Sequence, residues 1–331
     1  MYWISNNNTN NTCIKFGCKH FSNSTSTFLH ALDCINSYRN HQQEKKRTRP
    51  KMKNILLITS LFFLLFHSTL YSQDICDCPS QSKIGKGTFY FSWGYNKDWF
   101  SKSDIHFKNT TTAYDQTKNT PKSYDFTIYD VEATDRPGFK DITRTDLTIP
   151  QYVYRLGYYF NNKKDFGIEI NFDHTKYIMK DYQTLHVEGT IHGQTINQDT
   201  LISPIDFLHF EHSDGANFLM LNFIKRQRLL VSKDKKHWLN GIIKIGAGPV
   251  IPRTDVTIFG ENLNNKFHVA GYCMGVEAGL RYDAFKYIFI EYTAKSAFAN
   301  YTNVLVIGEG KANHHFWAFE NILTLGLQFP I

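Results

Sequence analysis

Cysteine is scarce in this sequence, and no window shows the sustained apolar stripe of an amphipathic helix. From Asp74 onward only Cys76, Cys78 and Cys273 remain. The first two form a C-x-C pair without further ligands nearby, which is a poor spacing for zinc, and Cys273 stands alone in a predicted strand. These positions argue neither a metal centre nor a catalytic thiol, and the sequence predicts no cofactor.

A charge excess is also missing from the main part of the chain. The formal net charge is +7, but residues 1–51 hold eight Lys or Arg against two Asp or Glu, and Lys53 adds one more. From Asp74 onward, 28 basic residues therefore stand against 28 acidic ones. A basic pI usually suggests a nucleic-acid partner, but here it comes from the leader, so we predict no nucleic-acid binding.

The leader contains an internal export signal. Lys51 and Lys53 precede an apolar run, Ile55 to Phe66, and a polar exit follows up to Gln73. The run is shorter than the roughly 20 residues of a membrane-spanning helix. We therefore expect four segments: a disordered upstream extension at 1–51 with Met52 as the true start, a signal peptide at 52–73, a short N-terminal segment at 74–85, and one domain at 86–331.

Eight runs in that domain alternate apolar and small or polar residues with the period of a β-strand. Each run is close to the 9–11 residues that cross a bilayer as a tilted strand. The runs are GTFYFSWGYN, PQYVYRLGYYF, DFGIEINFDH, NFLMLNFIK, GIIKIGAGPVI, GYCMGVEAGLRY, YIFIEYTAKSAF and FWAFENILTLGLQF. The pattern predicts an all-β fold, an antiparallel up-and-down barrel of about eight strands.

The two faces of these strands differ in a way that favours a membrane barrel over a soluble one. One face carries Phe, Ile, Leu, Tyr and Trp with almost no charge, as lipid requires. The other face mixes glycine with charges of both signs, which suits the crowded lumen of a small barrel. The charged residues, which we expect to form a structural network that plugs the lumen, are Arg155, Glu169, Asp173, Lys244, Glu277, Arg281, Glu291, Lys295 and Glu320.

Connections between the runs alternate in length. Short turns on one rim and long loops on the other are typical of bacterial outer-membrane barrels, and the long loops here are 99–147, 177–213, 254–267 and 300–311. Within the second loop, QTLHVEGTIHGQTINQDT alternates around His192-Gly193, and such a hairpin would make ten strands if it joined the barrel wall. Residues 225–240 would form an unusually long and basic connection on the short-turn rim.

The C-terminal stretch ENILTLGLQFPI resembles the final-strand assembly signal of outer-membrane barrels, although it continues two residues past Phe329. With the signal peptide, this stretch makes the chain similar to small outer-membrane β-barrel proteins of the OmpA-like transmembrane class, of a Bacteroidota type. The resemblance covers residues 86–329 in pattern. It implies location in the cell outer membrane, contact with outer-membrane lipid, and handling by the barrel-assembly machinery.

Four alternatives stay open beside a non-enzymatic barrel that acts through its outward loops. A lipid A deacylase would need a His-x-Ser-Asn motif, but Asn300 stands at the base position and Thr302-Asn303 follow it. Glu320 could match the acid, and His314 or His315 could replace the base in space, although nothing in the sequence requires it. His209, Glu211 and His212 could offer imidazoles to a metal, without an evident third ligand. A soluble lipocalin-like carrier would place the apolar face inward, and a porin-like pore would require an open lumen.

Overall fold

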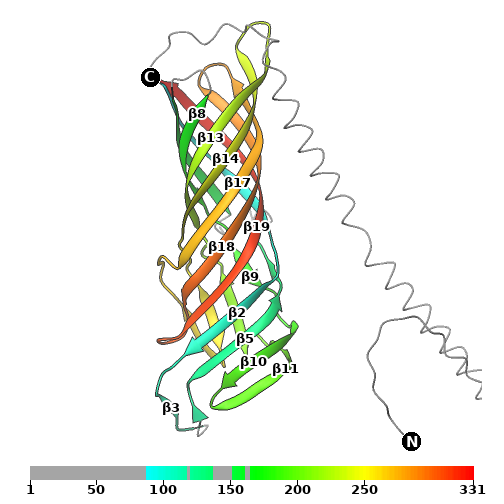
Figure 1. Cartoon of the computed structure of the whole chain (residues 1–331), viewed down its shortest axis with the longest axis vertical. Helices are drawn as coiled ribbons and strands as arrows, with labels where there is room; N and C mark the ends of the chain where they lie inside the picture. The colour runs from blue at the N-terminus through cyan, green and yellow to red at the C-terminus, as the bar shows by residue number, and fades with distance from the viewer. Residues whose placement is uncertain (1–86, 118–119, 137–150, 161–164) are drawn as a thin grey trace, which may run out of the picture. The chain divides into compact units, whose positions relative to one another are not determined.

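Eight antiparallel strands form a closed barrel in the computed structural model (Figure 1). The structure describes residues 87–117, 120–136, 151–160 and 165–331. All of them belong to one of the chain's two units, Ser80–Ile331, so the segments predicted at 1–51, 52–73 and 74–85 lie outside the described residues. Within the described ranges, no helix has the length and apolar character needed to cross a membrane.

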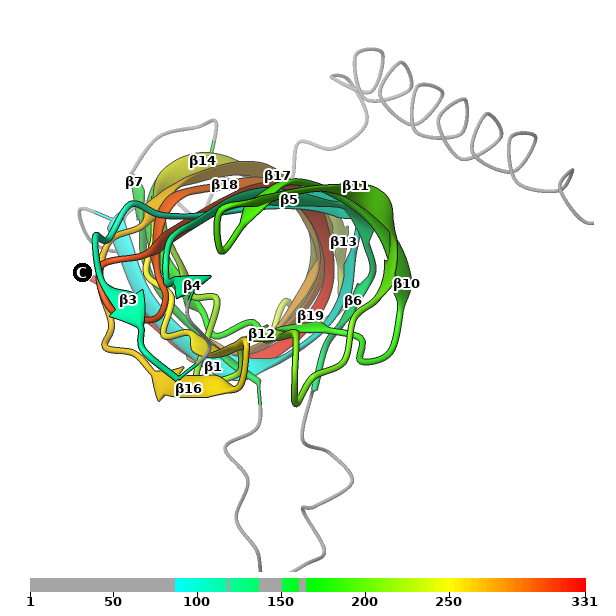
Figure 2. The ribbon, with the colours of Figure 1, turned by 90° about the horizontal axis from the view of Figure 1, so that it is seen from below.

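The barrel wall follows the chain order of its strands, and Figure 2 shows the ring that they form. The first strand, β1, pairs with the last, β19, so that Phe89 lies opposite Phe329 and the wall has no free edge. The strands are β1 (Gly87–Phe100), β7 (Tyr152–Phe160), β8 (Phe166–Asp173), β13 (Phe218–Val231), β14 (His237–Val250), β17 (Gly271–Ala284), β18 (Ile288–Leu305) and β19 (Lys311–Pro330). The prediction of an all-β antiparallel barrel with eight strands is confirmed.

Side chains alternate between the outside and the inside of the wall, as the period of two requires. Along β1, for example, Phe91 and Trp93 are more than 40% exposed, whereas Ser92 is buried. Together the outward side chains make an apolar band around the barrel. Its members include Phe89, Phe91, Trp93, Tyr154, Leu156, Ile168, Ile170, Leu221, Phe223, Ile243, Ile245, Met274, Val276, Leu280, Ile288, Ile290, Tyr292, Phe319, Leu323, Leu325 and Leu327.

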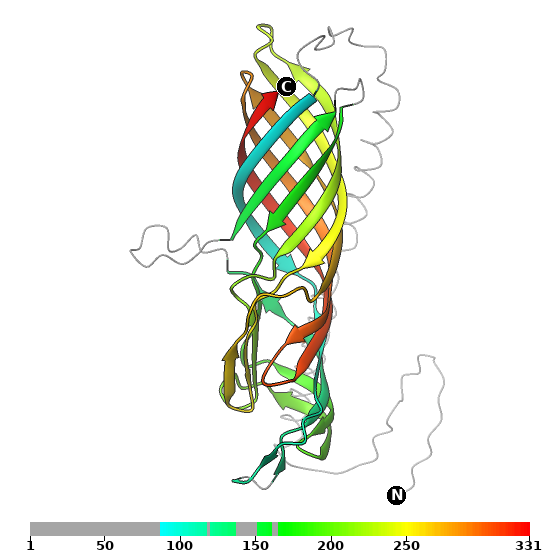
Figure 3. The same cartoon turned by 90° about the vertical axis from the view of Figure 1, so that its left-hand side faces the viewer.

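The long loops fold into a second layer of structure at one end of the barrel, visible in the lower part of Figure 3 and here called the cap. The wall sheet continues from the end of β19 into β2 (Ser103–Asn109), β5 (Tyr124–Val131), β10 (Thr184–Ile191) and β11 (Gln194–Leu201). A five-stranded sheet also forms from β6 (Ala133–Thr134), β9 (Tyr177–Met179), β12 (Leu208–His212), β15 (Asp255–Ile258) and β16 (Glu261–Asn264). A small hairpin joins β3 (Tyr114–Asp115) to β4 (Thr120–Pro121).

Aromatic side chains from both cap sheets meet in a shared core. Phe107 of β2 stacks on Phe126 of β5, with ring centroids 5.3 Å apart, and meets Phe210 of β12 edge-on at 5.5 Å. All three rings are at most 1% exposed. The cap is therefore a folded β-structure with its own buried core, which loops that only connect strands would not need.

The hairpin predicted around His192-Gly193 is present, whereas the long basic connection predicted at 225–240 is not. The sequence around His192-Gly193 does form a hairpin, β10–β11, but this hairpin pairs with β5 in the cap and adds no strand to the barrel wall. Residues 225–240 are not a long connection, and that expectation was wrong. Strand β13 runs to Val231 and β14 starts at His237, so a tight turn at 232–236 joins them. β13 extends past its last pair with β8, at Lys225, whereas β14 pairs with β17 along its whole length.

Candidate functional site

All nine charged residues expected in the lumen lie inside the barrel and are at most 4% exposed. They come from β7, β8, β14, β17, β18 and β19, at inward positions of each strand. The sequence places them there because each shares the parity of its buried neighbours along a strand with a period of two. The structure therefore brings the whole predicted set together in one compartment.

Lys244 is the centre of the first group of ion pairs. Its Nζ lies 2.7 Å from Glu291 Oε1 and 3.1 Å from both Glu277 Oε1 and Glu169 Oε2. The Tyr90 hydroxyl also donates to Glu169 Oε2 at 2.7 Å. Lys244 donates hydrogen bonds to Glu169 and Glu291, and the Glu277 carboxylate adds a third negative charge at ion-pair distance. Paired and hydrogen-bonded in this way, the ammonium charge can be buried without a large desolvation loss.

Arg155 and Lys295 join this group to a second one. The Arg155 guanidinium contacts the Asp173 carboxylate and lies 3.7 Å from both Glu169 and Glu277. Lys295 also contacts Asp173, and its Nζ is 3.1 Å from Glu320 Oε1. Arg281 completes the set with contacts at 3.0 Å to Asp283 and 3.7 Å to Glu291. The network is continuous across the lumen.

Three further charged residues of the lumen network were not predicted, because they lie at strand ends just beyond the alternating runs. Asp98 lies opposite Glu320 in the β1–β19 register, and its carboxylate accepts hydrogen bonds from Asn96 and Gln151. Asp283 pairs with Arg281, and Arg226 lies 3.9 Å from Asp283. Asp98 shares the inward parity of Asn96, so extending the alternation by two residues would have found it.

Apolar layers lie on both sides of this charged layer. Towards the chain termini, Tyr90, Tyr159, Ile224 and Phe289 form a buried cluster. A Cβ on Gly157 would lie 2.3 Å from Tyr90, and one on Gly326 would lie 2.1 Å from Phe289, so these glycines let the rings lie flat against the wall. Towards the cap, Phe218, Met220 and Phe316 belong to the large apolar core. The lumen is thus filled by side chains along its length, as expected for eight strands.

The residues of the hydrolase alternative do not converge. Glu320 and His314 are both on β19 and point inward, but six residues at about 3.3 Å each separate them by about 20 Å along the strand. His315 lies on the exposed face opposite Asn300, and the Thr302 hydroxyl donates to the Ala270 carbonyl. A base and its orienting acid must lie within hydrogen-bond reach, so this set has no such arrangement.

The two histidines of the metal-binding alternative are also split. His209 and His212 point to opposite sides of β12, and no group of three or more potential metal ligands occurs in the described part of the chain. His209 Nε2 lies 3.5 Å from Glu211 and its Nδ1 lies 3.2 Å from Asp181, and these contacts raise the pKa of His209 to about 8. His212 is buried in the cap core, where desolvation lowers its pKa to about 3.

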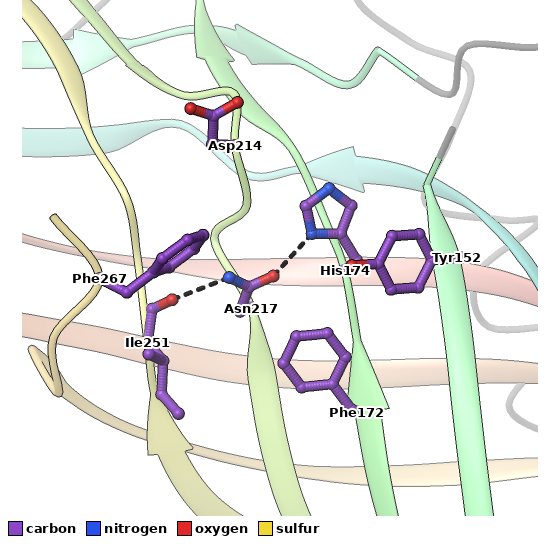
Figure 4. A pocket seen from close by; sticks show the side chains of 7 residues that line it. All are labelled: Tyr152, Phe172, His174, Asp214, Asn217, Ile251 and Phe267. Atoms are coloured by element: carbon purple, nitrogen blue, oxygen red, sulfur yellow. Dashed lines mark hydrogen bonds between the residues drawn. The ribbon is translucent and has the colours of Figure 1, made fainter. Parts of the chain in front are cut away.

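An open cavity of about 280 Å³ lies on the outside of the barrel where the wall meets the cap (Figure 4). Its lining comes from the ends of β7 and β8 and from the segments that follow β12 and β14 and precede β17: Tyr152, Phe172, His174, Asp214, Asn217, Ile251 and Phe267. These residues could not be recognised as a site from the sequence, since they come together only through the fold. Three aromatic rings and several polar atoms line one recess.

The chain resembles several solved outer-membrane proteins, at low identity and low structural similarity. No family model matches the chain, and no curated protein matches it. Solved structures that resemble it include the attachment invasion locus protein Ail of Yersinia pestis, at 11% identity and TM-score 0.28, covering 74% of this chain and 99% of that one. They also include OprG of Pseudomonas aeruginosa, at 10% identity and TM-score 0.33, covering 75% and 98%. A third is the outer membrane protease OmpT of Escherichia coli, at 9% identity and TM-score 0.30, covering 75% and 98%.

Proposed function

We propose that this chain is an outer-membrane β-barrel protein whose barrel anchors the cap outside the cell, where the cap surface meets its partner. One observation carries the proposal: the barrel exposes large apolar side chains on the outside and buries its charges inside. A soluble lipocalin-like carrier has the opposite distribution, because its outer face meets water. A β-sheet can cross a membrane when its wall is closed, so that every backbone group is paired, and when its outer face is apolar.

The proposed orientation follows from the rim at which the first barrel strand begins and the last one ends. Gly87 and Ile331 exchange backbone hydrogen bonds, so the described barrel starts and ends at the same rim, opposite the cap. Since an exported chain enters the outer membrane from the periplasm, this rim would be periplasmic and the cap would face outward. The final strand β19 would be the segment that the barrel-assembly machinery recognises. The basic 232–236 turn would then lie in the periplasm.

The cap is better suited to binding a partner at the surface than the lumen is to transport. The connections 101–151, 174–217 and 251–270 are far longer than is needed to join strands, and their described residues form the cap sheets around a shared core. The lumen, in contrast, is filled by ion pairs between apolar layers. We infer that the charged network is structural and that binding takes place on the cap, without enzymatic chemistry.

An epitope-display experiment tests both location and orientation. One short epitope is inserted in the exposed turn after Gly308, at the cap end, and the same epitope is inserted in the turn after Lys235, at the opposite rim. Antibody should stain intact cells for the first insertion and only permeabilised cells for the second. The purified protein should require detergent and should migrate differently on gels before and after heating. Staining of both insertions on intact cells, or a folded product without detergent, would refute the proposal.

A further inference from the structure

The cavity in Figure 4 has hydrogen-bond acceptors whose positions are fixed by the fold. Asn217 Nδ2 donates to the Ile251 carbonyl at 2.9 Å, so its Oδ1 is the atom that lies 2.8 Å from His174 Nδ1. Because this oxygen can only accept, His174 Nδ1 must carry the hydrogen. The other ring nitrogen, Nε2, then presents a lone pair, and the one side-chain hydrogen bond that His174 makes among the described residues is the one at Nδ1.

The surroundings keep this histidine in place and uncharged. Its ring stacks on Tyr152, with centroids 4.6 Å apart and planes inclined by 12°, and only 5% of the residue is exposed. Desolvation lowers the pKa of His174, so the neutral form with its acceptor nitrogen is the form present near neutral pH. Asn217, at a positive φ of 32° and 2% exposed, is equally fixed. Such fixed polar groups are typical of sites that orient a ligand.

The opposite wall offers a partly neutralised acid and an exposed ring. Asp214 Oδ2 lies 3.1 Å from Arg253 Nη1, and the Arg253 guanidinium lies 5.8 Å from the centre of the Phe267 ring. Phe267 is 52% exposed, so its ring is accessible to a ligand. A second acceptor and a second aromatic face therefore lie across the cavity from His174 and Tyr152.

We propose that this cavity binds the ring of an uncharged saccharide. Its volume lies just under the usual range of about 300–1,000 Å³, so it would hold one ring-sized group. The aromatic rings would cover the C–H face of the sugar, while His174 Nε2 and Asp214 accept hydrogen bonds from its hydroxyls. A phosphate or sulfate group is disfavoured, because neutral His174 cannot pair with it and Asp214 would repel it. The sugar could be free or could be the head group of a membrane glycolipid.

The site can be tested by ligand-detected NMR on the purified barrel in lauryldimethylamine oxide, a detergent without sugar. The probes are methyl β-D-glucopyranoside, methyl α-D-mannopyranoside and N-acetylglucosamine, with glucose 6-phosphate as the charged comparison. At least one neutral glycoside should give saturation transfer, and glucose 6-phosphate should give less. Phe267→Ala and His174→Gln should abolish the signal. The matched control is Phe285→Ala, which removes an equally exposed ring at the opposite rim and should retain it.

A second arm distinguishes the two sources of the sugar. The protein is placed in nanodiscs of phosphatidylglycerol with or without a monoglucosyl glycolipid, and glycolipid retained after purification is measured for the parent and for Phe267→Ala. Selective retention by the parent alone, without binding of free glycosides, assigns the site to a lipid head group. Absence of binding in both arms, or binding that survives both Phe267→Ala and His174→Gln, would overturn the proposal. Because the epitope experiment does not involve this cavity, its result is independent of this one.

Discussion

The imidazole rings of His212 and His314 face each other inside the cap, with their Nε2 atoms 3.2 Å apart. One ring must donate and the other accept, so at least one of these two nitrogens carries no hydrogen. His212 Nδ1 lies 2.9 Å from the Thr254 hydroxyl, whereas His314 Nδ1 has no partner in the described part of the chain. Both rings are buried, and desolvation lowers the pKa of each.

This pair predicts that acid destabilises the cap. A histidine whose folded pKa is lowered to about 3 binds no proton in the folded state at pH 5, whereas the unfolded chain binds one below about 6.5. Stability is therefore complete above pH 6.5 and falls as the pH drops, by roughly 2 kcal/mol at pH 5 for His212, and His314 changes it in the same direction. Proteolysis of the cap at pH 5 should be faster than at pH 7.5. His314→Phe should reduce that difference, and His315→Phe, on the exposed face, should not.

His209 should have the opposite pH dependence, although it lies only three residues from His212. Glu211 and Asp181 raise its pKa to about 8, so its contribution to stability is present below about pH 6.5 and is lost as the pH rises through 8. His209→Gln should therefore weaken the cap at pH 6, by at most about 2 kcal/mol, and should change little at pH 9. Denaturant unfolding of the cap at both pH values gives the comparison. An equal loss at pH 6 and pH 9 would show that the ion pairs contribute nothing.

The barrel could be predicted from sequence because its rule is local. A strand that meets lipid on one side and a packed lumen on the other must alternate at every residue, so runs such as DFGIEINFDH identify both the strand and the inward positions of Glu169 and Asp173. Strand ends follow a weaker pattern. Asp98 was missed for this reason, because the run was ended at Asn96.

The cap could not be predicted in the same way, because its contacts join residues far apart in the chain. Phe107 meets Phe210, and His212 meets His314, each across about 100 residues. The hairpin around His192-Gly193 was visible locally, but its place in the cap depends on pairing between Val187 and Ile128. The cavity at His174 likewise depends on five separate segments of the chain.

The lumen network should respond very differently to the loss of a cation and of an anion. Lys295→Met leaves Asp173 and Glu320 without their shared ammonium group, a change expected to cost about 3–5 kcal/mol in a buried site. Asp98→Asn removes the negative charge that lies opposite Glu320 in the strand register, and it keeps the shape of the side chain. We expect Lys295→Met to lower the temperature at which the barrel loses its fast-migrating gel form, and Asp98→Asn to leave it unchanged or raise it. A larger drop for Asp98→Asn would contradict this account of the network.

Arginine substitutions distinguish the apolar band from an ordinary exposed surface. Ile170, Ile290 and Leu325 are 51%, 48% and 58% exposed, and Leu230, on the extended hairpin away from the band, is 65% exposed. In water all four changes to Arg would be nearly neutral. In a bilayer, Arg near mid-membrane costs about 2–4 kcal/mol and close to nothing near the interface. Ile170→Arg, Ile290→Arg and Leu325→Arg should therefore each reduce the folded fraction in urea titrations performed in phospholipid vesicles, while Leu230→Arg should match the parent. Equal behaviour of all four variants would mean that the band does not face lipid.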